Sequence, residues 1–267
     1  MALALIIALP FLGIFLPLLL ERTGRSACAF GAGLAPLAAL VLLLSKREEV
    51  FAGETEIQTL PWLPELGLNL SLRLDGLGFL FALLILGIGL LVILYARYYL
   101  SKKDPMGRFF GYFLLFMGSM LGVVLSENLL LMLMFWELTS LSSFLLIGYW
   151  SHRSDARQGA RMALTITGGG GLALLAGILL IGHIVGSYEL TTVLASGDLI
   201  RAHGLYPLTL ILVLLGVFTK SAQFPFHFWL PQAMAAPTPV SAFLHSATMV
   251  KAGVFLLARL YPALADS

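Results

Sequence analysis

Residues 129–150 read LLLMLMFWELTSLSSFLLIGYW, with Glu137 as their one charged side chain. A helix needs about 20 consecutive apolar residues to cross the hydrocarbon core of a bilayer, so this run is long enough to span it. The whole chain has the same character, since 59% of its 267 residues are hydrophobic, 11% are charged and the mean hydropathy is +0.95. A soluble domain carries about a quarter charged residues. The sequence therefore predicts an integral membrane protein.

Apolar runs of spanning length predict an all-α polytopic membrane protein with about eight transmembrane helices. They cover residues 3–20, 27–45, 76–100, 109–126, 129–150, 162–186, 205–222 and 242–261. The first run is interpreted as a retained helix rather than a signal peptide, because Arg22 and Arg25 follow it and no basic segment precedes it. In the seventh run Pro225 lacks a backbone donor, so this helix is expected to break near Lys220 and Pro225.

The connecting loops alternate in charge, which predicts the orientation of the chain. Loops 21–26, 97–108 and 151–161 are net basic, whereas loops 46–75 and 187–204 and the turn at Glu127 are acidic. Basic loops stay on the cytoplasmic side of a membrane, so the N-terminus and loop 46–75 are expected outside. The net charge of +2 is too small to indicate nucleic-acid binding. With Cys28 as the single cysteine, a disulfide framework and a cysteine-rich metal site are excluded.

The longest predicted external loop, 46–75, contains strand signals. Residues 68–75 alternate between apolar and polar with a period of two. Prolines and Gly67 separate them from a second extended stretch at 57–60. A small external β-hairpin and an irregular amphipathic loop are both compatible with this pattern.

Four ionisable residues fall well inside predicted helices: Glu137, Lys220, His245 and Lys251. An ionisable side chain at membrane depth costs several kcal/mol, so it indicates a functional site. Glu137 lies roughly 13 Å from the start of its helix at 1.5 Å per residue, near the middle of the membrane. The alternative for Glu137 is a hydrogen-bonded structural carboxyl at a helix contact.

Lys220 lies beside the predicted helix break, and His227 begins the short apolar piece 226–236. Backbone groups freed by a break inside a membrane must be buried in protein or line a wet cavity, and many transporters bind ions at broken helices. Histidine titrates close to neutral pH, so His227 and His245 are favoured as proton relays. The alternatives are a lysine that extends to the interface and a histidine that only joins helices, and the latter is preferred for His183.

Other kinds of chemistry fit this sequence less well. Lysines are unusual metal ligands, and no clustered histidine or carboxylate spacing occurs. No arrangement of serine, histidine and aspartate suggests nucleophilic catalysis. The glycines at 168–171 lack the Lys-Ser/Thr of a phosphate loop and are interpreted as a site of close helix packing. Of the functions considered for these charged residues, transfer of protons or cations fits the sequence best.

Three stretches resemble a known family. They are residues 135–148 (FWELTSLSSFLLIG), 220–234 (KSAQFPFHFWLPQAM) and 236–253 (APTPVSAFLHSATMVKAG). These motifs are similar to those of the antiporter-like subunits shared by respiratory complex I and Mrp cation/proton antiporters. Lys251 and the Trp-Glu-Leu-Thr-Ser motif look most like the N-terminal part of the large A subunit of Mrp complexes.

The resemblance implies a role for each intramembrane residue. Glu137 would pair with Lys220, and His245 and Lys251 would pass protons onward along a path at mid-membrane, with His227 in support. No cofactor and no resident metal are implied. The expected partners are the bilayer of a prokaryotic plasma (inner) membrane, other subunits of an antiporter complex, protons and Na⁺. The chain would be an ion transporter subunit rather than an enzyme.

Two further hypotheses stay open beside the Na⁺/proton antiporter. One is a proton-translocating membrane subunit of a complex I-type NADH-quinone oxidoreductase or a membrane-bound hydrogenase. The other is a structural membrane subunit whose charges only hold helices together.

The resemblance also implies a division of the chain into three parts. Residues 1–75 hold two N-terminal helices and the external loop, residues 76–106 hold the third helix, and residues 107–267 form the first antiporter-like five-helix repeat. Members of this family have about fourteen or more helices, arranged as two inverted five-helix repeats. We therefore expect either a fragment of a longer protein or a split subunit that a partner completes.

Overall fold

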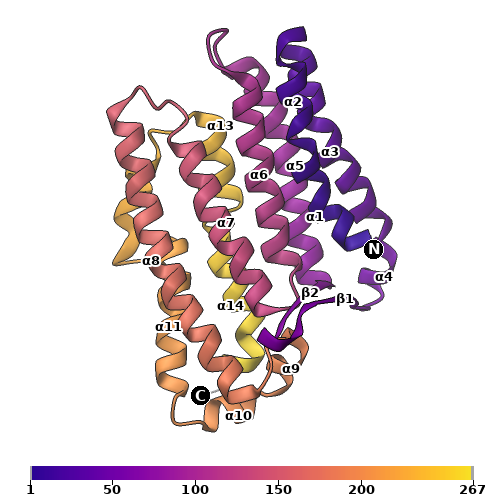
Figure 1. The fold of residues 1–267 in the computed structure, drawn as a ribbon, viewed down its shortest axis with the longest axis vertical. Helices are drawn as coiled ribbons and strands as arrows, with labels where there is room; N and C mark the ends of the chain where they lie inside the picture. The colour runs from indigo at the N-terminus through magenta and orange to yellow at the C-terminus, as the bar shows by residue number, and fades with distance from the viewer. Residues whose placement is uncertain (1, 266–267) are drawn as a thin grey trace.

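The computed structural model describes residues 2–265, which form an elongated bundle of helices that run alternately up and down (Figure 1). Seven helical segments of this part of the chain are long and apolar enough to cross a membrane. They are Ala2–Thr23 (α1 Ala2–Gly13, α2 Phe15–Leu20 and η1 Glu21–Thr23), α3 (Arg25–Ser45), α5 (Gly76–Tyr99), α6 (Met106–Leu125), α7 (Leu129–Ile147), α8 (Ser154–Val185) and Thr238–Leu264. An eighth apolar helix, α11 (Tyr206–Lys220), has 15 residues. The predicted all-α membrane fold is confirmed.

The predicted break in the seventh helix is present. α11 ends at Lys220, and helical structure returns only with η3 (Phe226–Phe228) and α12 (Trp229–Ala233). Pro225 immediately precedes η3 and has no N–H with which to continue the hydrogen-bond ladder of α11. The seventh transmembrane segment therefore consists of two short helices with an irregular stretch between them.

The last segment is also interrupted, which the sequence did not predict. A short α13 (Thr238–Ser241) leads into a π-helical turn, η4 (Ala242–Ala247), and regular helix returns only with α14 (Lys251–Leu264). Thr248 has a φ of −131° and a ψ of −72°. Its hydroxyl donates to the carbonyl of Phe243, five residues earlier, at 2.7 Å. Such π-turns inside helices occur frequently at functional sites.

The loop at residues 46–75 contains a two-stranded sheet, so the hairpin hypothesis is confirmed. β1 (Glu56–Leu63) pairs antiparallel with β2 (Leu68–Leu74), and Thr59 lies opposite Ser71. The same loop holds the short helices α4 (Arg47–Phe51) and η2 (Pro64–Leu66).

The acidic loops gather at one end of the bundle. The hairpin, α9 (Leu190–Ala195) and α10 (Gly197–Ala202) lie together at the lower end in Figure 1, away from the turns that follow α5 and α7. Asn128 joins these parts, because its side chain caps α7 and donates to the carbonyl of Gly67 at 2.8 Å and to Glu189 at 2.9 Å. Acidic and basic loops therefore lie at opposite ends of the bundle, as expected for loops that alternate in charge between helices that alternate in direction.

Asp75 connects the hairpin to α5 and α14. Its carboxylate accepts from the backbone N–H of Gly78 at 2.9 Å and so caps α5. Arg73 Nε and Arg259 Nη2 donate to the same carboxylate at 2.8 Å and 2.9 Å. Burial raises the pKa of Asp75, but the hydrogen bonds and charge of the two arginines outweigh it and hold the pKa well below its ordinary value.

The C-terminal end of α14 is fixed by side chains of α10 and of the first residue of α11. Arg201 Nη1 donates to the carbonyls of Pro262 at 3.1 Å and Ala265 at 2.9 Å. Tyr206 Oη donates to the carbonyl of Leu264 at 2.8 Å. The last carbonyls of a helix have no partner inside it, so these donors complete their hydrogen bonding.

We expect Asp75→Asn to lower the free energy of unfolding by about 2–4 kcal/mol at pH 7, because the buried Arg259 loses its counter-charge and Arg73 keeps only Glu127. The Asp75 carboxyl has a lower pKa in the folded state than in the unfolded state, where it is about 3.9. Its ionised form therefore stabilises the fold above about pH 4, and this stabilisation is lost as the pH falls toward the folded-state pKa. The difference in thermal midpoint between wild type and variant should therefore narrow below about pH 4.

The control for this measurement is Asp198→Asn, which removes an exposed pair with Arg201 and should change the midpoint little. Equal thermal midpoints of wild type and Asp75→Asn at pH 7, measured in detergent, would contradict the role of Asp75.

Candidate functional site

The Lys220 side chain is fully buried where α11 meets α7. Its Nζ donates to Ser140 Oγ at 2.7 Å and to the carbonyl of Trp136 at 3.0 Å. The same nitrogen lies 5.3 Å from the centre of the Trp136 ring. These acceptors come one residue before and three residues after Glu137 on α7. The ammonium therefore sits against the helical turn that carries Glu137.

Glu137 is the ninth of the 19 residues of α7 and points toward α8, where a β-carbon on Gly171 would collide with its Oε1. That oxygen is buried and has no hydrogen-bond partner among the described residues. Within residues 2–265, no N···O contact of 4.0 Å or less joins Glu137 to Lys220, because the ammonium binds the carbonyl and hydroxyl nearer to it. The two groups adjoin one helical turn without forming a direct ion pair.

The close packing predicted at the glycine run of α8 is confirmed for two of its members. Gly171 leaves room for the Glu137 carboxylate. Gly170 leaves room for the side chain of Thr219, because a β-carbon there would collide with it. A β-carbon on Gly169 would meet open space. The missing β-carbons thus let polar side chains of α7 and α11 approach the α8 backbone.

His245 lies in the π-turn and is 8% exposed. Neither of its ring nitrogens has a hydrogen-bond partner in the part of the chain that the structure describes. Its ring packs edge-on against Trp229, with the centroids 6.0 Å apart. Trp229 Nε1 in turn donates to the carbonyl of Thr219 at 2.9 Å, next to Lys220. A buried indole therefore connects His245 to the end of α11.

One hydrogen bond joins the two helix breaks. Ser221 follows Lys220 directly, and its hydroxyl donates at 2.7 Å to the carbonyl of Val250, which directly precedes Lys251. A β-carbon on Gly253 would collide with the same hydroxyl. The interruptions of the seventh and eighth segments are therefore in direct contact.

The other two candidate residues lie on the surface of this chain. His227 is exposed and stacks on a neighbouring phenylalanine, with ring centroids 5.9 Å apart. Lys251 is exposed at the first residue of α14. The structure therefore brings the half-buried Glu137 and the buried Lys220 and His245 into one region and leaves His227 and Lys251 outside it.

Several polar atoms of this region have unused hydrogen-bonding capacity. Glu137 Oε1 and both nitrogens of His245 keep unused hydrogen-bonding capacity. An ammonium has three donors, of which Lys220 uses two on the protein. Among residues 2–265 there is no group of three or more histidine, cysteine or carboxylate side chains that could hold a metal ion. Titratable groups with free donors and acceptors have the chemistry that proton transfer needs.

Sequence reasoning missed some residues of this site. Ser140 was identifiable, since it lies three residues after Glu137 and residues at this spacing share a helix face. Trp229 and the π-turn at Thr248 left no comparable signal, because their roles depend on contacts between segments far apart in the chain.

We expect Ser140→Ala to lower the free energy of unfolding by about 1–3 kcal/mol, because a buried ammonium loses its shortest hydrogen bond. Ser143→Ala is the matched control, since the Ser143 hydroxyl bonds only within α7, to the carbonyl of Ser140 at 2.8 Å. Thermal midpoints in detergent at neutral pH would measure both. The assignment fails if the two variants have equal midpoints.

Two family models match the sequence. The one described as NADH:quinone oxidoreductase/Mrp antiporter, TM, covers residues 126–267, and the one described as NADH-Ubiquinone oxidoreductase (complex I), chain 5 N-terminus, covers residues 62–110. The chain is 59% identical, over 99% of its length, to the A/B subunit of a probable K⁺/H⁺ antiporter of Rhizobium meliloti. It is 49% identical, over 97% of its length, to the A subunit of a Na⁺/H⁺ antiporter of Alkalihalophilus pseudofirmus.

The chain spans only part of these relatives, 26% of the first and 32% of the second. Its fold also matches the Mrp complex from Dietzia sp. DQ12-45-1b, with a TM-score of 0.87 and 38% sequence identity. That match covers 100% of this chain and 29% of the chain in the complex.

Proposed function

Because this chain belongs to the NADH:quinone oxidoreductase/Mrp antiporter family of membrane proteins, we propose that it forms part of a multisubunit Na⁺/proton antiporter. The observation that carries this proposal is the fully buried Lys220, held by Trp136 and Ser140 against the turn of α7 that bears Glu137. Burial of a lysine at membrane depth is costly, and proton transfer gives a reason to keep it there. The names of the relatives, which are components of K⁺/H⁺ and Na⁺/H⁺ antiporters, support the same function.

In the proposed path, protons move between Glu137, Lys220, His245 and Lys251, with His227 in support. The short Ser140 contact and the unused capacity of Glu137 and His245 let water bridge the first three groups. A lysine suits protons better than Na⁺, because hard cations prefer oxygen ligands. The path would therefore carry protons, while Na⁺ crosses elsewhere in the complex.

We further propose that residues 107–267 are the translocation unit, with residues 1–75 and 76–106 packed beside it. The family model over residues 126–267 supports this division, as does the position of the buried Lys220 and His245 and the half-buried Glu137 among α7, α8, α11 and η4. The basic end of the bundle would face the cytoplasm of a prokaryotic cell across its plasma membrane, which puts the N-terminus outside.

Lys251 and His227 require partners beyond this chain. An exposed lysine on a spanning segment is costly against lipid, so other protein must cover α14 there. We propose that further helices of the antiporter, from a longer polypeptide or from a separate protein, cover this face and continue the path.

To test this function, the complete antiporter complex is expressed in a salt-sensitive strain that lacks its own antiporter. We expect Glu137→Ala and Lys220→Ala each to lower Na⁺/proton antiport in membrane vesicles on the order of a hundredfold, because each removes a proton-transfer group. Lys103→Ala, an exposed lysine at the basic end, is the control and should leave antiport and abundance unchanged. Normal antiport and salt tolerance in the Glu137 and Lys220 variants would overturn the proposal.

An oxidoreductase-linked proton pump is the second candidate, because both family descriptions name NADH oxidoreductases. Vesicles containing the complex would then take up protons when NADH is supplied, and would not exchange Na⁺ for protons across an imposed pH gradient. The two measurements on the same vesicles separate the candidates.

The contact between α7 and α8 gives a second test of the path. We expect Gly171→Ala to lower antiport about tenfold to a hundredfold, because the added methyl group displaces the Glu137 carboxylate. Gly169→Ala adds the same methyl group to the same helix in open space, so antiport should be retained. Equal activity of the two variants would contradict the proposed position of Glu137.

A further inference from the structure

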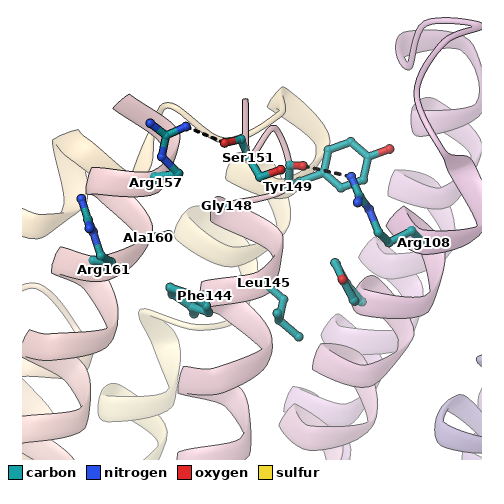
Figure 2. A pocket seen from close by; sticks show the side chains of 10 residues that line it. Arg108, Phe144, Leu145, Gly148, Tyr149, Ser151, Arg157, Ala160 and Arg161 are labelled. Atoms are coloured by element: carbon teal, nitrogen blue, oxygen red, sulfur yellow. Dashed lines mark hydrogen bonds between the residues drawn. The ribbon is translucent and has the colours of Figure 1, made fainter. Parts of the chain in front are cut away.

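A cleft of about 370 Å³ opens at the basic end of the bundle, remote from the turn that carries Glu137. Figure 2 shows it between the start of α6, the end of α7 and the start of α8. Arg108 of α6 stands on one side, and Arg157 and Arg161 of α8 stand on the other. Acidic residues are absent from the described residues that line it. The lining of the cleft is therefore positive, with one carboxylate, that of Asp104, held nearby by Trp150.

Most of the guanidinium donors in the cleft are unused. Arg108 Nη2 donates to the carbonyl of Tyr149 at 3.3 Å, and Arg157 Nη1 donates to that of Ser151 at 2.7 Å. Arg161 makes no hydrogen bond or ion pair to any described residue. Each guanidinium has five N–H donors in a planar fork that fits phosphate oxygens. The two protein bonds orient the side chains and leave them able to bind an anion.

The depth of the cleft matches that of lipid headgroups. α8 has 32 residues, which at 1.5 Å per residue is about 48 Å, well beyond the hydrocarbon core of about 30 Å. α8 is therefore long enough for its first turns, which carry Arg157 and Arg161, to project past the acyl chains. Arg108 is the third residue of α6, and Tyr149 lies just past the end of α7. All parts of the cleft thus meet at a membrane surface.

Below the arginines the cleft continues as apolar surface. Phe144 and Leu145 line its floor. On α7, Leu141 lies one turn below Leu145 and is 50% exposed, and Met134 two turns further is 47% exposed. These residues recur at the spacing of one helix face. The positive cleft complements an anionic headgroup, and the apolar side chains beneath it complement an acyl chain. Together they match the two parts of an anionic phospholipid.

We propose that this cleft binds the phosphate of an anionic phospholipid, with an acyl chain along the exposed face of α7. Arginine pairs phosphate bidentately, and basic pockets between transmembrane helices on the cytoplasmic side bind anionic headgroups. The occupant is a lipid rather than a free phosphate ion, because the apolar track needs an acyl chain to cover it.

The test uses the complete membrane complex purified in detergent, with retained lipids counted by mass spectrometry. Affinity for added phosphatidylglycerol should fall about fivefold for each arginine changed to alanine, because basic residues near an anionic lipid surface contribute similar binding free energies. It should fall further in the double variant Arg157→Ala/Arg161→Ala. Arg161→Lys should fall between wild type and Arg161→Ala, because it keeps the charge and loses the fork. Lys102→Ala/Lys103→Ala removes exposed charge from the same end and should leave affinity unchanged.

Thermal shifts separate the possible sources of the phosphate. Phosphatidylglycerol should raise the thermal midpoint of the wild-type complex, and phosphatidylcholine and inorganic phosphate should not. Protection by inorganic phosphate equal to that by phosphatidylglycerol would overturn the lipid as occupant. Unchanged lipid retention in all arginine variants would overturn the site. Crosslinking of Leu141→Cys to a different protein of the complex in native membranes would assign the track to protein instead and equally overturn the proposal.

Discussion

The ammonium of Lys220 must find hydrogen-bond acceptors inside the protein, because an unpaired charge in a low-dielectric interior costs more than one helix contact returns. The Trp136 carbonyl and the Ser140 hydroxyl supply them, so the end of α11 has to lie within reach of α7 for a lysine side chain. α8 packs against both helices, and it can do so only because Gly170 lacks a side chain where Thr219 approaches. The termination of α11, the polar face of α7 and the glycine run of α8 are therefore linked parts of one arrangement around a single positive group.

Polar and charged groups lie at three levels of the bundle, and they have a different role at each level. At mid-depth, the broken seventh and eighth segments meet through the bond from Ser221 to Val250, which satisfies backbone groups that an intact helix would have used internally. At the acidic end, Asp75 and its arginines hold the hairpin to the helices. At the basic end, guanidinium groups remain open to the membrane surface. Apart from the exposed His227 and Lys251, the ionisable residues of these three levels lie at the two ends of the bundle or are enclosed by its helices.

The fold was largely predictable from the sequence, because hydrocarbon imposes one length and one polarity on every spanning helix. Pro225 made the first helix break visible, and the period-two pattern at residues 68–75 predicted β2. The second break was not predictable, since Thr248 is an ordinary residue whose hydroxyl stabilises the π-turn only in its local geometry. Within the site, the sequence identified the ionisable residues but not their contacts. The resemblance implied that Glu137 pairs with Lys220, and the structure adds the Trp136 carbonyl and the Ser140 hydroxyl as acceptors of the ammonium, which composition alone does not reveal.

The attachment of α14 differs sharply between its two ends. Near its C-terminus, Arg259 is bound to Asp75, and Arg201 and Tyr206 hold the final carbonyls. At its N-terminus, Lys251 follows a π-turn, and α14 is held there by packing of Gly253 against α11 and by the hydrogen bond from Ser221 to Val250. The charged groups that fix α14 thus lie at its C-terminal end. A displacement of α14 about that end would be largest at Lys251, the residue of the helix that is farthest from it.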